Sequence, residues 1–138
     1  MSKNVVVDAS VALSWLLPGE ETEKTLQLRH RAITNTKLRL LVPPIFWYEV
    51  ANVLWVAAKR QRILPSDAMA GLRALLDFHF EIAVTDPTDS ISISFTHNIA
   101  VYDSSYLSVA QNHNAILWTI DQELIKAAQN LELLVEPE

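Results

Sequence analysis

Residues 4–10 read NVVVDAS, and this stretch decides how the rest of the chain is interpreted. Three consecutive valines without polar alternation are typical of a strand that is buried on both faces in the middle of a parallel sheet. The run ends at Asp8, and the apolar segment VALSWLL follows shortly after it. Because ligands bind at the carboxyl edge of open α/β sheets, Asp8 is a candidate functional residue. An Asp before a helix is also a common N-cap, so Asp8 alone leaves both interpretations open.

Hydrophobic blocks alternate with turn residues along the rest of the chain. Residues 87–99 are ambiguous, because apolar residues alternate with serines there as in a strand, while Asp86-Pro87 is typical of a helix entry; we expect a helix. We expect further helices at 9–17, 20–33, 45–60, 65–78, 103–112 and 121–130, and further strands at 38–42, 80–84, 115–120 and 133–135. This alternation predicts an α/β fold with a small parallel β-sheet sandwiched between α-helices.

Length and composition restrict the class of protein. The 138 residues fit one domain, residues 1–138, and no apolar run reaches the roughly 18 to 20 residues of a membrane span. With no leader and no cysteine, we expect a cytoplasmic protein without a membrane partner. The net charge of -5 argues against broad adhesion to nucleic acid. It does not exclude a nuclease, because carboxylates that hold divalent cations make a protein acidic.

Four carboxylates form the candidate site. Asp103 follows IAVY and Asp121 follows ILWTI, so both can meet Asp8 at one edge of a parallel sheet, although capping explains each of the three singly. Glu49 is different, because it lies within FWYEVANVLW, where Asn52 is the one other polar residue. A buried carboxylate needs a cation, a proton or an interface, and Asn52 is a candidate supporting residue beside it.

The ligand types indicate the metal. A set of carboxylates without His or Cys suits Mg²⁺ or Mn²⁺ rather than zinc, and pairs of such ions activate water for the hydrolysis of phosphodiesters. Ser10 and Thr119 lie two residues from Asp8 and Asp121, where their hydroxyls either orient ligands or cap the helices.

Four collinear motifs carry a resemblance that spans nearly the whole chain. They are DAS (8–10), PPIFWYEVANVL (43–54), YDSSYLSVA (102–110) and LWTIDQEL (117–124). In this order they resemble the motifs of PIN-domain ribonucleases, specifically VapC-type toxins of toxin–antitoxin pairs. The resemblance implies an endoribonuclease that depends on Mg²⁺ or Mn²⁺, with Asp8, Glu49, Asp103 and Asp121 as catalytic and metal-binding residues. It also implies a homodimer and a cognate antitoxin that blocks the site.

Other interpretations remain beside this one. The main alternative is a non-catalytic α/β binding protein whose acids are helix caps. A response-regulator receiver would have paired acids after the first strand, and a haloacid-dehalogenase-like phosphatase would have Asp in place of Ser10.

Two groups of residues give further expectations about partners. Lys59, Arg60 and Arg62 are either RNA contacts or favourable charges at a helix C-terminus. Trp15, Trp47 and Trp55, with the apolar residues around them, give more apolar surface than is needed to cover one face of a sheet of this size. This excess predicts a homodimer and an apolar groove for an antitoxin segment.

Overall fold

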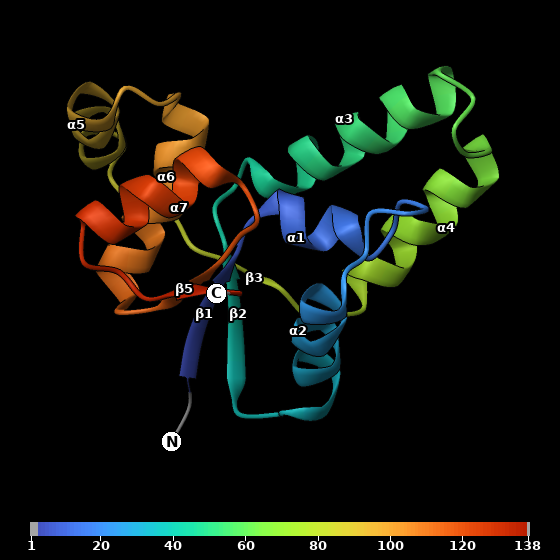
Figure 1. Ribbon diagram of the computed structural model, residues 1–138, viewed down its shortest axis with the longest axis horizontal. Coiled ribbons are helices and arrows are strands. Elements are labelled where there is room, and N and C mark those ends of the chain that lie inside the picture. Colours follow the sequence, from blue (N-terminus) through green and yellow to red (C-terminus); the bar gives the residue numbers. More distant parts are fainter. Residues whose placement is uncertain (1–2, 138) are drawn as a thin grey trace.

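The computed structural model describes residues 3–137, and these form a parallel sheet covered by helices (Figure 1). Within this range five strands pair in the order β3-β2-β1-β4-β5, and every pair is parallel. The valines of the central strand are fully buried, as the NVVV run predicts. The strands are β1 (Lys3–Val7), β2 (Leu38–Val42), β3 (Glu81–Ile82), β4 (Ile116–Trp118) and β5 (Val135–Glu136).

The helices follow the predicted order, with boundaries within three residues of those expected. Residues 87–97 are helical, because Asp86 accepts a capping hydrogen bond from the Thr88 amide at 2.9 Å and Ile93 packs into the core. The second helix begins at Glu23 rather than at residue 20, because Thr22 caps it. The helices are α1 (Ala9–Ser14), α2 (Glu23–Thr34), α3 (Phe46–Lys59), α4 (Pro65–Leu76), α5 (Pro87–His97), α6 (Val101–His113) and α7 (Gln122–Asn130).

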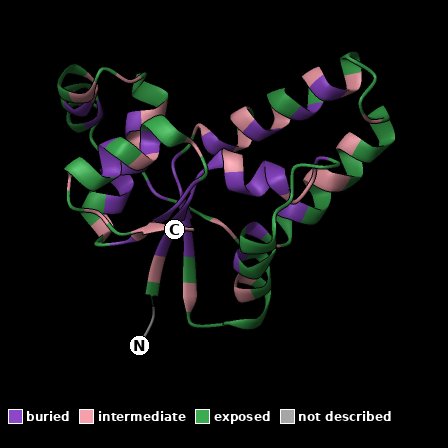
Figure 2. Ribbon diagram, viewed as in Figure 1, coloured by how far each residue is buried: buried purple, intermediate pink, exposed green. Residues whose placement is uncertain are grey.

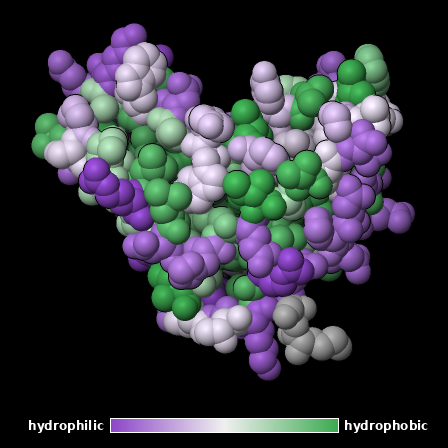
Figure 3. Space-filling model, turned by 180° about the vertical axis from the view of Figure 1, so that it is seen from behind, coloured by the Kyte–Doolittle hydropathy of each residue, from purple (hydrophilic) through white to green (hydrophobic). Residues whose placement is uncertain are grey.

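The layers leave two lobes above the sheet. Helix α6 contacts β1, β2 and β4, and α5 packs on α6, while α3 contacts α1 and α4 and forms the other lobe. Figure 2 shows burial concentrated in the strands, in α1 and in α6. The space-filling view from behind shows a hollow between the lobes (Figure 3). None of the helices within residues 3–137 is long and apolar enough to cross a membrane.

Helix α3 is buried on one side only, although its sequence is apolar nearly all round, which indicates a helix that is either buried in the core or covered by a partner. The side chains that face the core recur with helical spacing at Phe46, Val50, Leu54 and Ala57. A second stripe, made of Tyr48, Asn52, Trp55 and Lys59, is exposed. A full helical surface of apolar residues therefore does not mean full burial here.

Two of the three tryptophans assigned to an interface pack inside the chain instead. Trp15 stacks on Phe78 with ring centroids 5.3 Å apart, and its indole N–H donates to the Thr25 carbonyl. Trp47 contacts Phe80 edge to face at 5.7 Å. These contacts join segments far apart in the sequence, so composition alone did not reveal them.

Candidate active site

Asp8 lies directly after the central strand, and two hydroxyl groups hold its carboxylate. Its backbone amide donates to the Trp118 carbonyl at 2.9 Å, which fixes the end of β1 beside the end of β4. Ser10 Oγ and Thr119 Oγ1 both donate to Asp8 Oδ2, at 2.5 and 2.9 Å. Asp8 is only 6% exposed, and burial raises the pKa of its carboxyl while the two hydroxyls lower it. Both predicted supporting hydroxyls therefore contact Asp8, and neither of them occupies Oδ1.

Glu49 lies half-buried in the first turn of α3, where Tyr106 of α6 holds it. Tyr106 is fully buried, and its hydroxyl donates to Glu49 Oε1 at 2.6 Å. Burial raises the pKa of Glu49, the Tyr106 hydrogen bond lowers it, and the charges of Asp8 and Asp103 raise it. Burial raises the pKa of Tyr106 most, and the charges of Asp8 and Glu49 raise it further, so its hydroxyl stays protonated and keeps donating.

Tyr106 is the residue that the sequence interpretation missed. The apolar pattern of the helix predicts only that Tyr106 lies on its buried side. That is correct for the ring, but it does not reveal that the hydroxyl donates to Glu49. It lies three residues after Asp103 in YDSSYL, which is close to one helical turn. That spacing, from a candidate metal ligand to a side chain with a polar tip, is the signal that would have identified it.

Asp103 and Asp121 lie at the starts of two more helices, but only Asp121 acts as a cap. Asp121 Oδ1 accepts from the backbone amides of Glu123 at 2.9 Å and Leu124 at 3.3 Å. Asp103 is the third residue of α6, and no side-chain capping bond is made at the Ala100 N-cap. Asp8 stands at the N-cap of α1 and makes no capping hydrogen bond either. Capping therefore accounts for Asp121 and leaves Asp8 and Asp103 unexplained.

The four carboxylates lie near enough to one another to interact electrostatically. Burial raises the pKa of Asp103 first, and the charges of Asp8, Asp121 and Glu123 raise it further. Asp121 also raises the pKa of Asp8. Glu123, which the sequence interpretation did not single out, is thus a further acid beside the site. Each of the four predicted acids stands at the beginning of a helix, where the helix dipole favours negative charge and offsets part of this repulsion.

The donor set fits a hard divalent cation such as Mg²⁺ or Mn²⁺. Asp8, Glu49 and Asp121 each use one carboxylate oxygen for the hydrogen bonds described above, and the second oxygen is outside those bonds. Within residues 3–137 no group of three acidic or imidazole side chains is already arranged to hold a metal ion. Mg²⁺ keeps several of its waters and binds proteins through one or two carboxylates, so an open cluster of acids suits it.

Within residues 3–137 the remaining predicted residues make no hydrogen bond or ion pair with the four acids. Asn52 belongs to the exposed stripe of α3. Lys59 and Arg60 end that helix, about 15 Å along its axis from Glu49 at 1.5 Å per residue. The Lys59 ammonium lies 4.9 Å from the centre of the exposed Trp55 ring, and Arg62 pairs with Glu20 at 3.0 Å. The structure therefore separates the basic cluster from the acids and neutralises part of it.

Comparison with known proteins places this chain among nucleases by similarity. The family model described as "PIN domain" matches residues 5–130. The chain is 29% identical over 137 residues to Ribonuclease VapC3 of Pyrobaculum aerophilum, which covers 96% of this chain and 98% of that protein. It is 30% identical over 92 residues to Exonuclease VapC9 of the same organism, covering 64% and 68% of the two chains.

Two solved structures share the fold. The crystal structure of PAE2754 from Pyrobaculum aerophilum has a TM-score of 0.73 at 22% identity, over 96% of this chain and 83% of that one. FitAcB from Neisseria gonorrhoeae has a TM-score of 0.63 at 18% identity, over 95% of both chains. At such identities the likeness concerns the fold alone, and it agrees with the parallel sheet and helical layers described above.

Proposed function

This chain belongs to the PIN-domain family, and from that premise we propose that it is a metal-dependent endoribonuclease and the toxin of a toxin–antitoxin pair. The proposal rests on the convergence of Asp8, Glu49, Asp103 and Asp121 at the carboxyl edge of the sheet, where burial and the charges of neighbouring acids raise the pKa of the first three. Hydrolysis of RNA is supported by the name Ribonuclease VapC3. Internal cleavage and the role as a toxin are supported by the resemblance of the motifs to those of VapC-type toxins.

The chain's own residues would hold and orient the cofactor, which we propose is Mg²⁺ or Mn²⁺. When bound at such acids, a divalent cation supplies an activated water and neutralises charge on the phosphate. Ser10 and Thr119 fix the carboxylate of Asp8, and Tyr106 fixes that of Glu49. The cap on α7 fixes Asp121. Fixed carboxylates lose less entropy on ligation, so these contacts would favour catalysis.

Asp103→Asn tests the catalytic assignment. Asn keeps the shape of the side chain and removes one charge, so RNA cleavage in Mn²⁺ should fall by more than about a hundredfold while the fold survives. Asp89→Asn is the matched control, because Asp89 is also the third residue of its helix and is exposed. Sequencing of RNA ends after induction in a host without the antitoxin would give the target. Cleavage by Asp103→Asn at the parent's rate would favour the alternative in which the acids serve structure only.

We also propose a homodimer and an antitoxin that covers the site. Large apolar side chains remain exposed on α3 and α5, including Tyr48 at 76% and Phe95 at 83%. Trp55 is exposed as well, whereas Trp15 and Trp47 no longer support this interface. Light scattering at tens of micromolar should give twice the chain mass of 15.6 kDa. A mass of one chain at these concentrations would contradict the dimer. The antitoxin would then be tested separately, by co-purification of a partner that blocks the RNase activity.

RNA contacts outside the acids remain a prediction. Lys59 and Arg60 are exposed, and they lie on the lobe formed by α3 and α4. Arg62 is less suited to bind phosphate, because its guanidinium already pairs with Glu20. Replacing Lys59 and Arg60 together by Gln should weaken RNA binding and flatten its salt dependence. An unchanged salt dependence would mean that these two residues do not bind RNA and serve only as favourable charges at the C-terminus of α3.

A further inference from the structure

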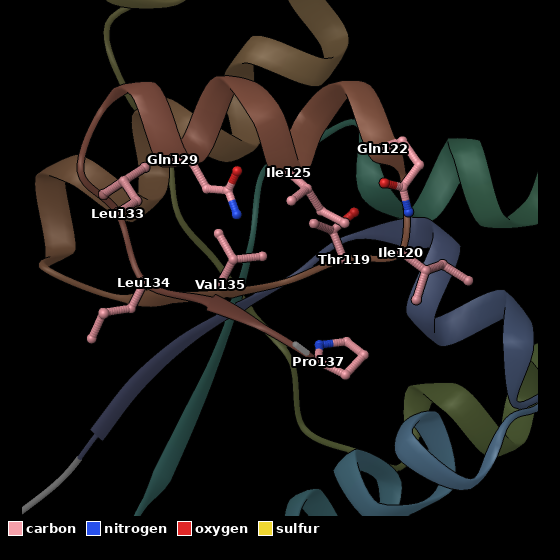
Figure 4. A pocket seen from close by; sticks show the side chains of 9 residues that line it. All are labelled: Thr119, Ile120, Gln122, Ile125, Gln129, Leu133, Leu134, Val135 and Pro137. Atoms are coloured by element: carbon pink, nitrogen blue, oxygen red, sulfur yellow. The ribbon is translucent and has the colours of Figure 1, made fainter.

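A pocket beside the proposed active site is lined entirely by uncharged side chains. It lies between α7 and β5 and has a volume of about 640 Å³, within the range of ligand pockets. Its lining includes Thr119, Gln122, Ile125, Gln129, Val135 and Pro137 (Figure 4). The acids described above do not line it, so the pocket is separate from the acidic cluster but lies next to it.

The wall formed by α7 is not explained by packing of the core. Gln122, Ile125 and Gln129 are spaced by three and four residues, so they share one face of the helix. The buried face of α7 is a different one, made of Leu124, Ala127 and Ala128. Figure 4 shows Ile125 and Gln129 projecting from α7 toward the side of Val135. Within residues 3–137 neither glutamine amide makes a hydrogen bond to another part of the chain.

Thr119 joins this pocket to the carboxylates. Its side chain lines the pocket, and its hydroxyl donates to Asp8 Oδ2 at 2.9 Å and accepts from the Asp121 amide at 3.1 Å. Gln122 follows Asp121 directly in the chain. A ligand held at the acids would therefore have its next chemical group beside the pocket.

A second, basic pocket adjoins the first and shares Pro137 with it. Its lining includes Lys24, Arg31 and Glu136, and its volume is about 400 Å³. The Arg31 guanidinium pairs with Glu136 at 2.7 Å, so it is held in place at this border. Arg31 is thus partly neutralised, as Arg62 is, so the feature that favours a nucleotide chain is the position of the uncharged pocket directly beside the acids. A nucleotide chain has matching chemistry, because a neutral aromatic base is attached beside each phosphate.

We infer that the pocket between α7 and β5 binds a nucleobase of the RNA next to the phosphate that is cleaved. Apolar walls suit the face of a base, and the amides of Gln122 and Gln129 offer donors and acceptors to its edge. An apolar peptide segment is the competing occupant, and we favour the base because Thr119 both lines the pocket and donates to Asp8, which places the pocket directly beside the proposed cleavage site. This inference rests on the proposed function, and it assigns the choice of RNA sequence to α7.

The test is the double variant Gln122→Met/Gln129→Met, which keeps side-chain length and removes both amides. Gln111→Met is the matched control, because Gln111 is an exposed helical glutamine that lines neither pocket. The probes are fluorescent RNA hexamers of A, C, G and U and an abasic ribose-phosphate hexamer, titrated in EDTA so that no cleavage occurs. The parent and the control should bind at least one base-bearing hexamer more tightly than the abasic one. The double variant should lose about tenfold in that affinity and keep the abasic affinity.

The outcomes separate the two proposals. Equal binding of every hexamer by parent and double variant overturns the base assignment, and it leaves an apolar peptide as the occupant. Cleavage of the same RNA by the parent in Mn²⁺ then shows that the proposed function survives this failure. The reverse result, loss of base discrimination in the variant without any cleavage by the parent, would support the base pocket and overturn the nuclease. Both glutamines are exposed, so matching melting temperatures should confirm that the variants fold.

Discussion

Asp103→Asn and Asp89→Asn form a matched pair that measures the repulsion among the acids. Both residues are third in their helices, α6 and α5, and neither is part of a side-chain capping bond in these helices. Both variants therefore lose the same favourable interaction with a helix N-terminus, about 0.3 to 1 kcal/mol. Burial raises the pKa of Asp103 first, and the charges of Asp8, Asp121 and Glu123 raise it further. The difference between the two variants thus reports the burial of Asp103 together with the effect of those neighbouring charges.

The pH dependence follows from the direction of the shifts. The carboxyls of Asp8, Glu49 and Asp103 have pKa values above their ordinary 3.8 for Asp and 4.5 for Glu. A raised folded-state pKa means that the folded protein binds more protons than the unfolded chain, so stability falls as pH rises. The contribution of these groups is complete below about pH 4 and is lost as pH rises through the raised values. The parent in EDTA should therefore lose stability from this site between acidic and neutral pH.

The expected size is measurable by calorimetry. Repulsion between partly exposed carboxylates is worth on the order of 0.5 kcal/mol for each pair after solvent screening, so relief from three neighbours gives about 1 to 1.5 kcal/mol. For a chain of this length 1 kcal/mol moves the melting temperature by about 3 °C. In EDTA at neutral pH, Asp103→Asn should thus melt about 3 to 5 °C above Asp89→Asn.

Mn²⁺ should cancel most of this difference, so that the two variants melt at about the same temperature. At a hundredfold excess over Kd it stabilises the parent and Asp89→Asn by about 2.7 kcal/mol, or roughly 8 °C. If loss of one ligand weakens binding tenfold, Asp103→Asn gains only about 1.4 kcal/mol, or roughly 4 °C. The assay is differential scanning calorimetry at several pH values with EDTA or Mn²⁺. Our reasoning is refuted if the two variants melt together in EDTA at neutral pH and gain equally from Mn²⁺.

Substitutions at three further residues test the contacts that hold the acids, each by calorimetry in EDTA and by RNA cleavage in Mn²⁺. Tyr106→Phe removes the donor to Glu49, so the melting temperature should fall by about 3 to 6 °C and Mn²⁺ should bind more weakly; unchanged Mn²⁺ affinity would leave Tyr106 a purely structural residue. In Asp121→Asn the side-chain oxygen can still accept from the two capped amides, so this variant should keep the parent's stability and lose RNA cleavage. Asp121→Ala removes the cap and should melt about 3 °C below Asp121→Asn. Equal melting of these two would contradict the capping role. Thr119→Val removes a buried donor and acceptor at once and should lower the free energy of unfolding by about 2 to 3 kcal/mol. Thr119→Ser keeps the hydroxyl and should retain most of that stability. If Thr119→Ser is as unstable as Thr119→Val, the loss comes from packing of the methyl group.

Local signals in the sequence predicted the fold and the order of its elements. The NVVV run, the proline pairs and the position of Asp86-Pro87 each act within a few residues of the chain, so their consequences can be read without the tertiary structure. The carboxyl edge of the parallel sheet then brings together segments that end in Asp8 and Asp121, because Val7 pairs with Trp118. Topology supplied this contact across more than a hundred residues.

Helix rotation and long-range pairing were not predictable in the same way. Glu49 and Asn52 are three residues apart on α3, yet Glu49 turns toward Tyr106 while Asn52 lies on the exposed stripe. The apolar residues on both sides of this helix leave its rotation undetermined, and packing against α1 and α4 fixes it. In the same way, Arg62 belongs to a basic cluster in the sequence, but the fold brings Glu20 to it. Residue type predicted what these side chains can bind, and packing decided what they meet.

The placement of the acids also explains how the chain keeps them together before a cation binds. Glu49, Asp103 and Asp121 stand at the N-terminal ends of α3, α6 and α7, which each span at least nine residues. At about 0.3 to 1 kcal/mol each, these helix dipoles return about 1 to 3 kcal/mol, which is similar to the screened repulsion that the acids generate. The helix ends thereby offset part of the cost of holding the charges, and less of the free energy of cation binding is consumed in assembling the site. A site built in this way should bind Mg²⁺ without a large change in backbone structure, so amide chemical shifts should move mainly at these helix starts.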